Sequence, residues 1–113
     1  ETRGMMSTKQ FEMMKPTASL INLSRGPVVD QAALCKALET HEIASAALDV
    51  LEHEPPAADE PIFKLPNVIL TPHFGGDTIE AKRRCSRKLA ETLVEAVSGG
   101  APYNWANRKA MEK

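Results

Sequence analysis

The stretch NVILTPHFGG, residues 67–76, joins an apolar run to an abrupt break in the chain. The run is too short for a helix, so it predicts a buried strand over residues 67–71. Pro72 favours an extended conformation in the residue before it, and the two glycines allow the backbone to approach a ligand closely. His73 is therefore predicted where a strand ends and the backbone turns. It is either a packed residue, an inert loop residue or a proton donor at the rim of a site.

Two further apolar runs predict strands of the same kind, ASLINL at residues 18–23 and IASAALDV at residues 43–50. Helical patterns lie between and around them. Ser7 and Gln10 form a capping-box pattern before a short helix over residues 8–15, which Pro16 stops. Asp30 is placed to cap a helix over residues 31–40. This alternation predicts an α/β fold with a parallel sheet and flanking helices.

A third helix follows residue 77, where Asp77 and Glu80 resemble a capping box. Leu89, Leu93 and Val97 recur at helical spacing, and the glycines at 99 and 100 end the helix. The remaining tail has no periodicity, and we expect at least its end to be loose.

Composition narrows the classes of function. The 113 residues carry a formal net charge of −1, which provides no long-range field for nucleic acid or an anionic membrane surface. No apolar run approaches the roughly 20 residues that span a bilayer. Cys35 and Cys85 have no spacing typical of a metal site, so we expect no metal, reduced thiols and a cytoplasmic location.

Polar side chains follow each predicted strand, and doubly wound sheets bind ligands at the carboxyl ends of their strands. Arg25 follows the first strand and is either a surface residue or a bidentate partner for a carboxylate. Asp49 ends the second strand, and Glu54 is fixed by two prolines after it. A glutamate beside His73 would favour the imidazolium and create a proton donor. Together these groups suit reduction of a 2-keto acid.

Three segments carry a specific resemblance: MKPTASLINLSRGPVVDQAAL, AALDVLEHEP and NVILTPHFGGDTIEA. In order and spacing they resemble the D-isomer-specific 2-hydroxyacid dehydrogenases over nearly the whole chain. The resemblance implies a Rossmann-type sheet and the latter half of the NAD(P)-binding domain over residues 1–107, with residues 108–113 as a tail. It implies NAD as cofactor, with NADP not excluded.

The resemblance also implies roles for individual residues. Arg25 would bind the substrate's carboxylate and carbonyl, and Glu54 would pair with His73, the proton donor to the carbonyl oxygen. Asp49 would contact the nicotinamide amide. The implied catalytic residues are Arg25, Glu54 and His73, and the implied cofactor-binding residues are Leu23, Ser24, Arg25, Asp49, His73, Gly75 and Gly76.

The family's GxGxxG turn and its substrate-binding domain do not occur in this sequence, so we expect a fragment that is inactive in isolation. The intact enzyme is expected to be a homodimer acting on a small 2-keto or 2-hydroxy acid, with hydroxypyruvate, glyoxylate and phosphoglycerate among the candidates. Two alternatives remain: a dinucleotide-sensing, partner-binding protein of the same fold, as in the related corepressors, and an inactive truncated remnant. The sequence upstream of Glu1 would be the most useful observation: a GxGxxG turn with a substrate domain before it would favour the enzyme, and a start codon near Glu1 would favour the remnant.

Overall fold

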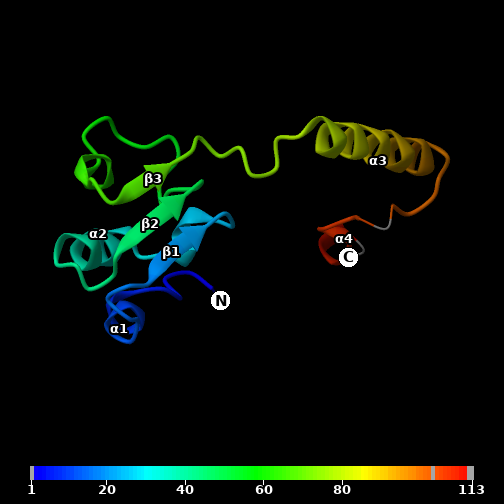
Figure 1. Ribbon diagram of the computed structural model, residues 1–113. Coiled ribbons are helices and arrows are strands. Elements are labelled where there is room, and N and C mark those ends of the chain that lie inside the picture. The colour runs from blue at the N-terminus through cyan, green and yellow to red at the C-terminus, as the bar shows by residue number, and fades with distance from the viewer. Residues whose placement is uncertain (1, 103, 112–113) are drawn as a thin grey trace. The chain divides into compact units, whose positions relative to one another are not determined.

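The computed structural model describes residues 2–102 and 104–111 (Figure 1). It divides the chain into two compact units, Glu1–Gly75 and Gly76–Lys113. Every residue with a predicted role in the site except Gly76 belongs to the first unit.

A three-stranded parallel sheet forms the centre of the first unit. Its strands are β1 (Ser19–Asn22), β2 (Ser45–Leu48) and β3 (Val68–Leu70), and they lie in the order β1-β2-β3. Ser19 pairs with Ser45 and Ala46 with Val68, so the carboxyl ends of the strands meet at one edge (Figure 1). The predicted α/β fold with a parallel sheet is confirmed. Each strand is shorter at both ends than its apolar run.

The helices of the first unit begin at the predicted caps. In α1 (Thr8–Glu12), the backbone N–H of Ser7 donates to the side chain of Gln10, and in α2 (Gln31–Glu39), Asp30 accepts from the backbone of Ala33. α1 ends at Glu12 rather than at residue 15. Pro16 excludes a helical conformation from the residue before it and clashes with the carbonyl four residues back, which is that of Glu12. Two 3-10 helices, η1 (Gly26–Val28) and η2 (Pro61–Lys64), were not predicted.

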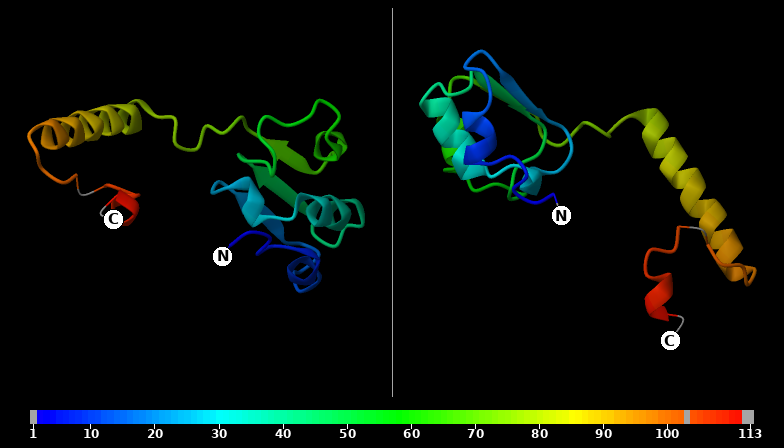
Figure 2. Two further views of the ribbon diagram at one scale, coloured as in Figure 1. Left: turned by 180° about the vertical axis from the view of Figure 1, so that it is seen from behind. Right: turned by 90° about the horizontal axis from the view of Figure 1, so that it is seen from below.

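The core lies between one face of the sheet and the helices α1 and α2. Figure 2 shows both helices on the same side of the sheet. The largest fully buried side chains of the core are Phe11, Leu34, Leu38, Ile43 and Ile62. Alternate strand residues such as Ala46 and Leu48 point into this core, whereas Ile21 and Ile69 point to the other face and are exposed. The period of two along each strand therefore divides the sheet into a packed face and an exposed face.

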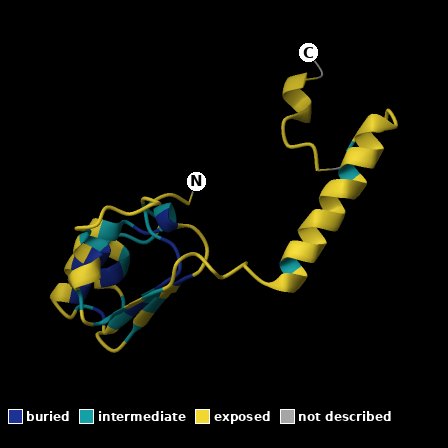
Figure 3. Cartoon of the chain, turned by 90° about the horizontal axis from the view of Figure 1, so that it is seen from above, coloured by how far each residue is buried: buried dark blue, intermediate teal, exposed yellow. Residues whose placement is uncertain are grey.

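The second unit contains α3 (Ile79–Val97) and α4 (Arg108–Met111). The cap of α3 differs from the prediction by one residue: the hydroxyl of Thr78, not Asp77, accepts from the backbone of Ala81, and Asp77 pairs with Lys82. α3 ends at Val97, and Gly99 follows with a φ of 80°, as the glycine signal predicted. Figure 3 colours most of α3 as exposed. The short α4 was not predicted, and residues 112–113 lie outside the described part of the tail.

Both cysteines are free, Cys35 buried in the first unit and Cys85 exposed on α3. Burial is the main cause that raises the pKa of the Cys35 thiol above its ordinary value. Among the described residues, no helix combines the length and apolar character needed to cross a membrane.

Candidate active site

The loop after β1 is held by the last residue of that strand. Asn22 is buried, and its side-chain oxygen accepts from the backbone N–H and the hydroxyl of Ser24 at 3.0 and 2.8 Å. Its amide nitrogen donates to the carbonyl of Arg25 at 3.1 Å. The guanidinium of Arg25 is exposed and donates to the carbonyl of Ser24 at 2.8 Å, a bond that uses one of its five N–H donors. The backbone of this loop is fixed by Asn22, and the outer part of the guanidinium faces solvent.

Asp49, directly after β2, is almost fully buried, with 3% of its surface exposed. One carboxylate oxygen accepts from the hydroxyl of Thr71 at 2.5 Å and from the N–H of Phe74 at 2.8 Å. The other accepts from the N–H of Gly75 at 2.7 Å. The bond from Thr71 is the largest cause that lowers the pKa of this carboxyl, and the two backbone N–H groups act in the same direction. Asp49 is thus a carboxylate that ties the end of β2 to the loop after β3.

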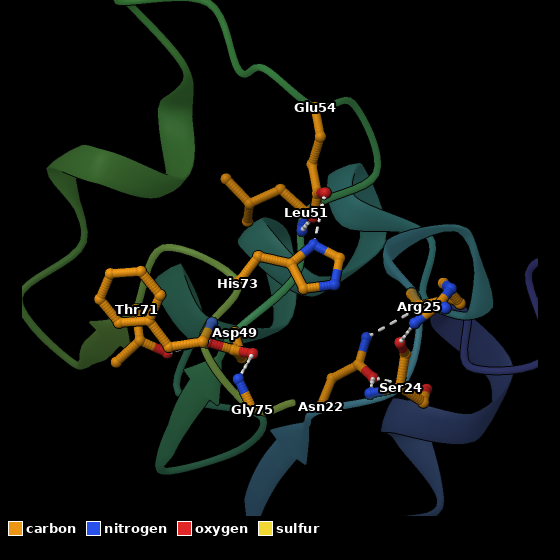
Figure 4. Close-up of polar contacts among 10 residues, drawn as sticks. Asn22, Ser24, Arg25, Asp49, Leu51, Glu54, Thr71, His73 and Gly75 are labelled. Atoms are coloured by element: carbon orange, nitrogen blue, oxygen red, sulfur yellow. Dashed lines mark hydrogen bonds and ion pairs between the residues drawn. The ribbon is translucent and has the colours of Figure 1, made fainter. Parts of the chain in front are cut away.

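Glu54 and His73 form the hydrogen-bonded pair that the sequence predicted. The Oε2 atom of Glu54 lies 2.8 Å from the Nδ1 atom of His73, and its Oε1 atom accepts from the backbone N–H of Leu51 at 3.0 Å. The bond to His73 is the main cause that lowers the pKa of Glu54; the Leu51 N–H contributes next, and the charge of Arg25 also lowers it. Figure 4 shows that the Nε2 atom of His73 faces away from Glu54, on the side where Arg25 lies.

A pocket of about 420 Å³ adjoins this pair. Its wall is mainly apolar, and Phe63 from η2 contributes to it. The lining residues are Asp49, Leu51, Glu54, Pro56, Phe63, Leu70, Thr71, Pro72 and His73. Three predicted site residues, Asp49, Glu54 and His73, are therefore brought together in one pocket.

The other predicted site residues do not line this pocket. Leu23, Ser24 and Arg25 form the loop after β1, where Leu23 is 65% exposed. Gly75 packs against Asp49: a Cβ atom at this position would lie 2.9 Å from the Asp49 carboxylate. Gly76 begins the second unit. The described residues contain no group of three or more histidine, cysteine, aspartate or glutamate side chains that could hold a metal ion.

Comparison with known protein families identifies the chain. A family model described as D-isomer specific 2-hydroxyacid dehydrogenase, NAD binding domain, matches residues 1–75. The chain belongs to this family. The matched residues coincide with the first compact unit, and the family assignment confirms both the recognised resemblance and the predicted NAD-binding, Rossmann-type fold.

Curated relatives in the dehydrogenase family are similar over nearly the whole chain. Glyoxylate/hydroxypyruvate reductase B of Klebsiella pneumoniae is 43% identical over 107 residues, which are 95% of this chain and 33% of that protein. D-3-phosphoglycerate dehydrogenase of Archaeoglobus fulgidus is 41% identical over 112 residues, 99% of this chain and 21% of that protein. The chain therefore spans a third or less of the length of these two relatives.

Solved structures of the dehydrogenase family have the same arrangement. The NADPH-dependent glyoxylate/hydroxypyruvate reductase of Sinorhizobium meliloti, in complex with citrate, superposes with a TM-score of 0.83 at 33% identity, over 90% of this chain and 32% of that one. D-lactate dehydrogenase of Lactobacillus jensenii, with NAD+, gives a TM-score of 0.77 at 37% identity, over 90% of this chain and 34% of that one. A relative named as NADPH-dependent and a relative solved with NAD+ are thus both similar to this chain.

The sequence did not single out the residues that hold the site loops in place. Asn22, Thr71 and the backbone N–H of Leu51 each bond to a predicted site residue or its loop. Asn22 carried a signal, because it is a polar residue at the end of an apolar run, where burial requires hydrogen-bond partners. Thr71 and Leu51 carried none, since their bonds depend on how two loops meet.

Proposed function

We propose that this chain is part of an NAD(P)-dependent D-2-hydroxyacid dehydrogenase. The whole enzyme would interconvert a 2-keto acid and a D-2-hydroxy acid. The observation that carries the proposal is the 2.8 Å pair between His73 and Glu54, with the second ring nitrogen of His73 on the side of Arg25. A proton donor after β3 and a carboxylate-binding cation after β1 are thereby available at the carboxyl ends of strands of one parallel sheet, with β2 between them.

Each residue has a distinct role in the proposed reaction. When bound, the nicotinamide supplies hydride to the keto carbon. Arg25 binds the substrate carboxylate through its planar guanidinium and orients the carbonyl group. The Nε2 atom of His73 gives its proton to the carbonyl oxygen as negative charge develops there, and takes a proton from the hydroxyl in the reverse direction. Glu54, on Nδ1, stabilises the imidazolium that donates this proton.

The residues present fit the nicotinamide end of the cofactor. Leu23 offers an exposed apolar surface beside Ser24 and Arg25 in the loop after β1. A GxGxxG turn for the pyrophosphate does not occur in these 113 residues. A small 2-keto acid substrate, a homodimeric enzyme and a cytoplasmic location belong to the same proposal.

Arg25→Lys tests the proposal in the enzyme that contains this chain. Lysine keeps the charge but cannot make the bidentate contact. The transition-state stabilisation that kcat/KM measures for glyoxylate or hydroxypyruvate should therefore fall by about 2–3 kcal/mol, the worth of a charge-assisted hydrogen bond. The Kd of NADH, measured by fluorescence titration, should stay nearly unchanged. Arg83→Lys, on the exposed surface of α3, is the matched control. Equal losses of substrate use and NADH binding would contradict the role of Arg25.

A further inference from the structure

The backbone at His73 adopts a conformation that its side chain disfavours. Its φ is 58°, in the left-handed region where a Cβ atom crowds the backbone. Its N–H donates to the carbonyl of Thr71 at 3.0 Å, which closes a tight turn over Pro72. Residues held in this region persist only where the surroundings fix them. The loop after β3 therefore needs an anchor outside itself.

Asp49 supplies that anchor from the neighbouring strand. Its carboxylate accepts a hydrogen bond from Thr71, two residues before His73, and from Phe74 and Gly75, which follow it. The three donors lie on both sides of the histidine, and the acceptor is buried. Hydrogen bonds to a charged acceptor are stronger than neutral ones. The carboxylate thus fixes the backbone before and after the left-handed residue.

We propose that Asp49 is a positioning residue: it clamps the Thr71–Gly75 turn and thereby aims the His73 imidazole at Glu54. The proposal rests on the proposed function in that His73 is taken as the proton donor. An amide could not replace the carboxylate, because its NH2 group would take the place of one oxygen and face the N–H of Phe74 or Gly75. The family resemblance implies a different role for Asp49, contact with the nicotinamide amide, and the two roles lead to different measurements.

A double-mutant cycle in the enzyme that contains this chain separates the two roles. Asp49→Asn should lower kcat/KM for keto acid reduction by about tenfold or more, the effect of losing charge-assisted hydrogen bonds. In a His73→Ala background the same change should have little further effect, because Asp49 acts through His73. The Kd of NADH should change by less than about threefold, well under the kcat/KM effect. Asp59→Asn, an exposed loop carboxylate, is the matched control. The clamp would be overturned if the effects of Asp49→Asn and His73→Ala on kcat/KM multiply in the double variant. It would also be overturned if Asp49→Asn lowers NADH affinity as much as kcat/KM.

Thr71 provides a milder pair of variants, because it is an exposed residue outside the hydrophobic core. Thr71→Val replaces the hydroxyl that donates to Asp49 with a methyl group and should lower kcat/KM by a smaller factor than Asp49→Asn. Thr71→Ser keeps the hydroxyl and should restore most of the activity. Equal activities in the valine and serine variants would count against the clamp.

Amide hydrogen exchange tests the clamp without catalysis. The N–H groups of Phe74 and Gly75 should exchange slowly in the wild type, because both donate to Asp49, and at least tenfold faster in Asp49→Asn. Asp59→Asn should leave their exchange unchanged. Unaltered protection in Asp49→Asn would overturn the clamp. The exchange rates do not depend on turnover. If the enzyme had no keto acid reductase activity, the proposed function would be refuted, and the exchange rates would still test the clamp.

Discussion

At the scale of single residues, the geometry keeps Glu54 ionised. Its two carboxylate oxygens accept from His73 and from the N–H of Leu51, and these bonds lower its pKa. A carboxyl whose pKa is lowered by folding contributes stability that is present above its unfolded value of about 4.3 and lost as the pH falls through the folded value. The Glu54 carboxylate is therefore ionised at neutral pH, where the proposed proton donor must work.

Glu54→Gln tests the charge of this pair. The amide keeps the shape and a hydrogen bond to His73 but no longer favours the imidazolium. The pH above which keto acid reduction fails should therefore move to lower pH in the variant. A pH series of kcat/KM for reduction measures this, with Glu12→Gln, at an exposed position of α1, as the control. An alkaline limb that stays in place would show that Glu54 does not tune His73.

The sequence allowed the charged residues of this site to be named, but not the groups that hold them. Glu54 and His73 were predicted as a pair, and the structure places them in contact. The roles assigned to Arg25 and to the cofactor-binding residues remain predictions. The anchors at Leu51 and Thr71 were beyond prediction, since a backbone N–H has no sequence signature and a threonine before a proline has many uses.

At the scale of elements, local signals predicted how α1 and α2 begin, and tertiary contacts decided the rest. The capping residues Ser7 and Asp30 act within one turn of chain, so their bonds could be read from the sequence. The 3-10 helices form where loops pack against the core, as Ile62 does in η2, and no periodic pattern marks them. The strands are shorter than the apolar runs because pairing with neighbours, not hydrophobicity, sets their ends.

Gly26 is where two of the site loops touch. A Cβ atom at this position would lie 1.7 Å from the carbonyl oxygen of Leu51. Gly26→Ala must therefore push the loop of Arg25 away from the loop of Glu54. We expect the free energy of unfolding to fall by about 1–3 kcal/mol, the usual effect of overpacking, and kcat/KM to fall with it. Denaturant titration measures the first effect.

Gly76→Ala is the stability control for this substitution, since a Cβ atom there meets nothing within 4 Å. Its unfolding transition should lie close to that of the wild type. A Gly26→Ala variant as stable as the wild type would mean that the two loops are not held in contact.

At the scale of the whole molecule, the family match and the first compact unit describe the same 75 residues. Within the described residues, β1 pairs with β2 alone, and its other edge has no partner strand. Unpaired edges are the usual sites of association between chains.

We predict that the 113 residues alone neither bind NADH measurably nor reduce keto acids, and that they self-associate. The sequence has no GxGxxG turn to receive the pyrophosphate, which supplies much of a dinucleotide's affinity. Calorimetric titration with NADH and light scattering of the purified chain measure the two outcomes. Tight NADH binding by this chain would show that the pyrophosphate turn is dispensable.

The hydrogen bonds made by Asn22, Asp49 and Leu51 have a consequence for ligand binding. Each fixes a site loop through the chain's own atoms, so the conformational entropy of these loops is lost during folding and not during binding. A substrate that reaches this site meets loops that are already ordered. The heat-capacity change of binding at these loops should then reflect only the surface that the ligand covers, without the large negative contribution that accompanies coupled folding.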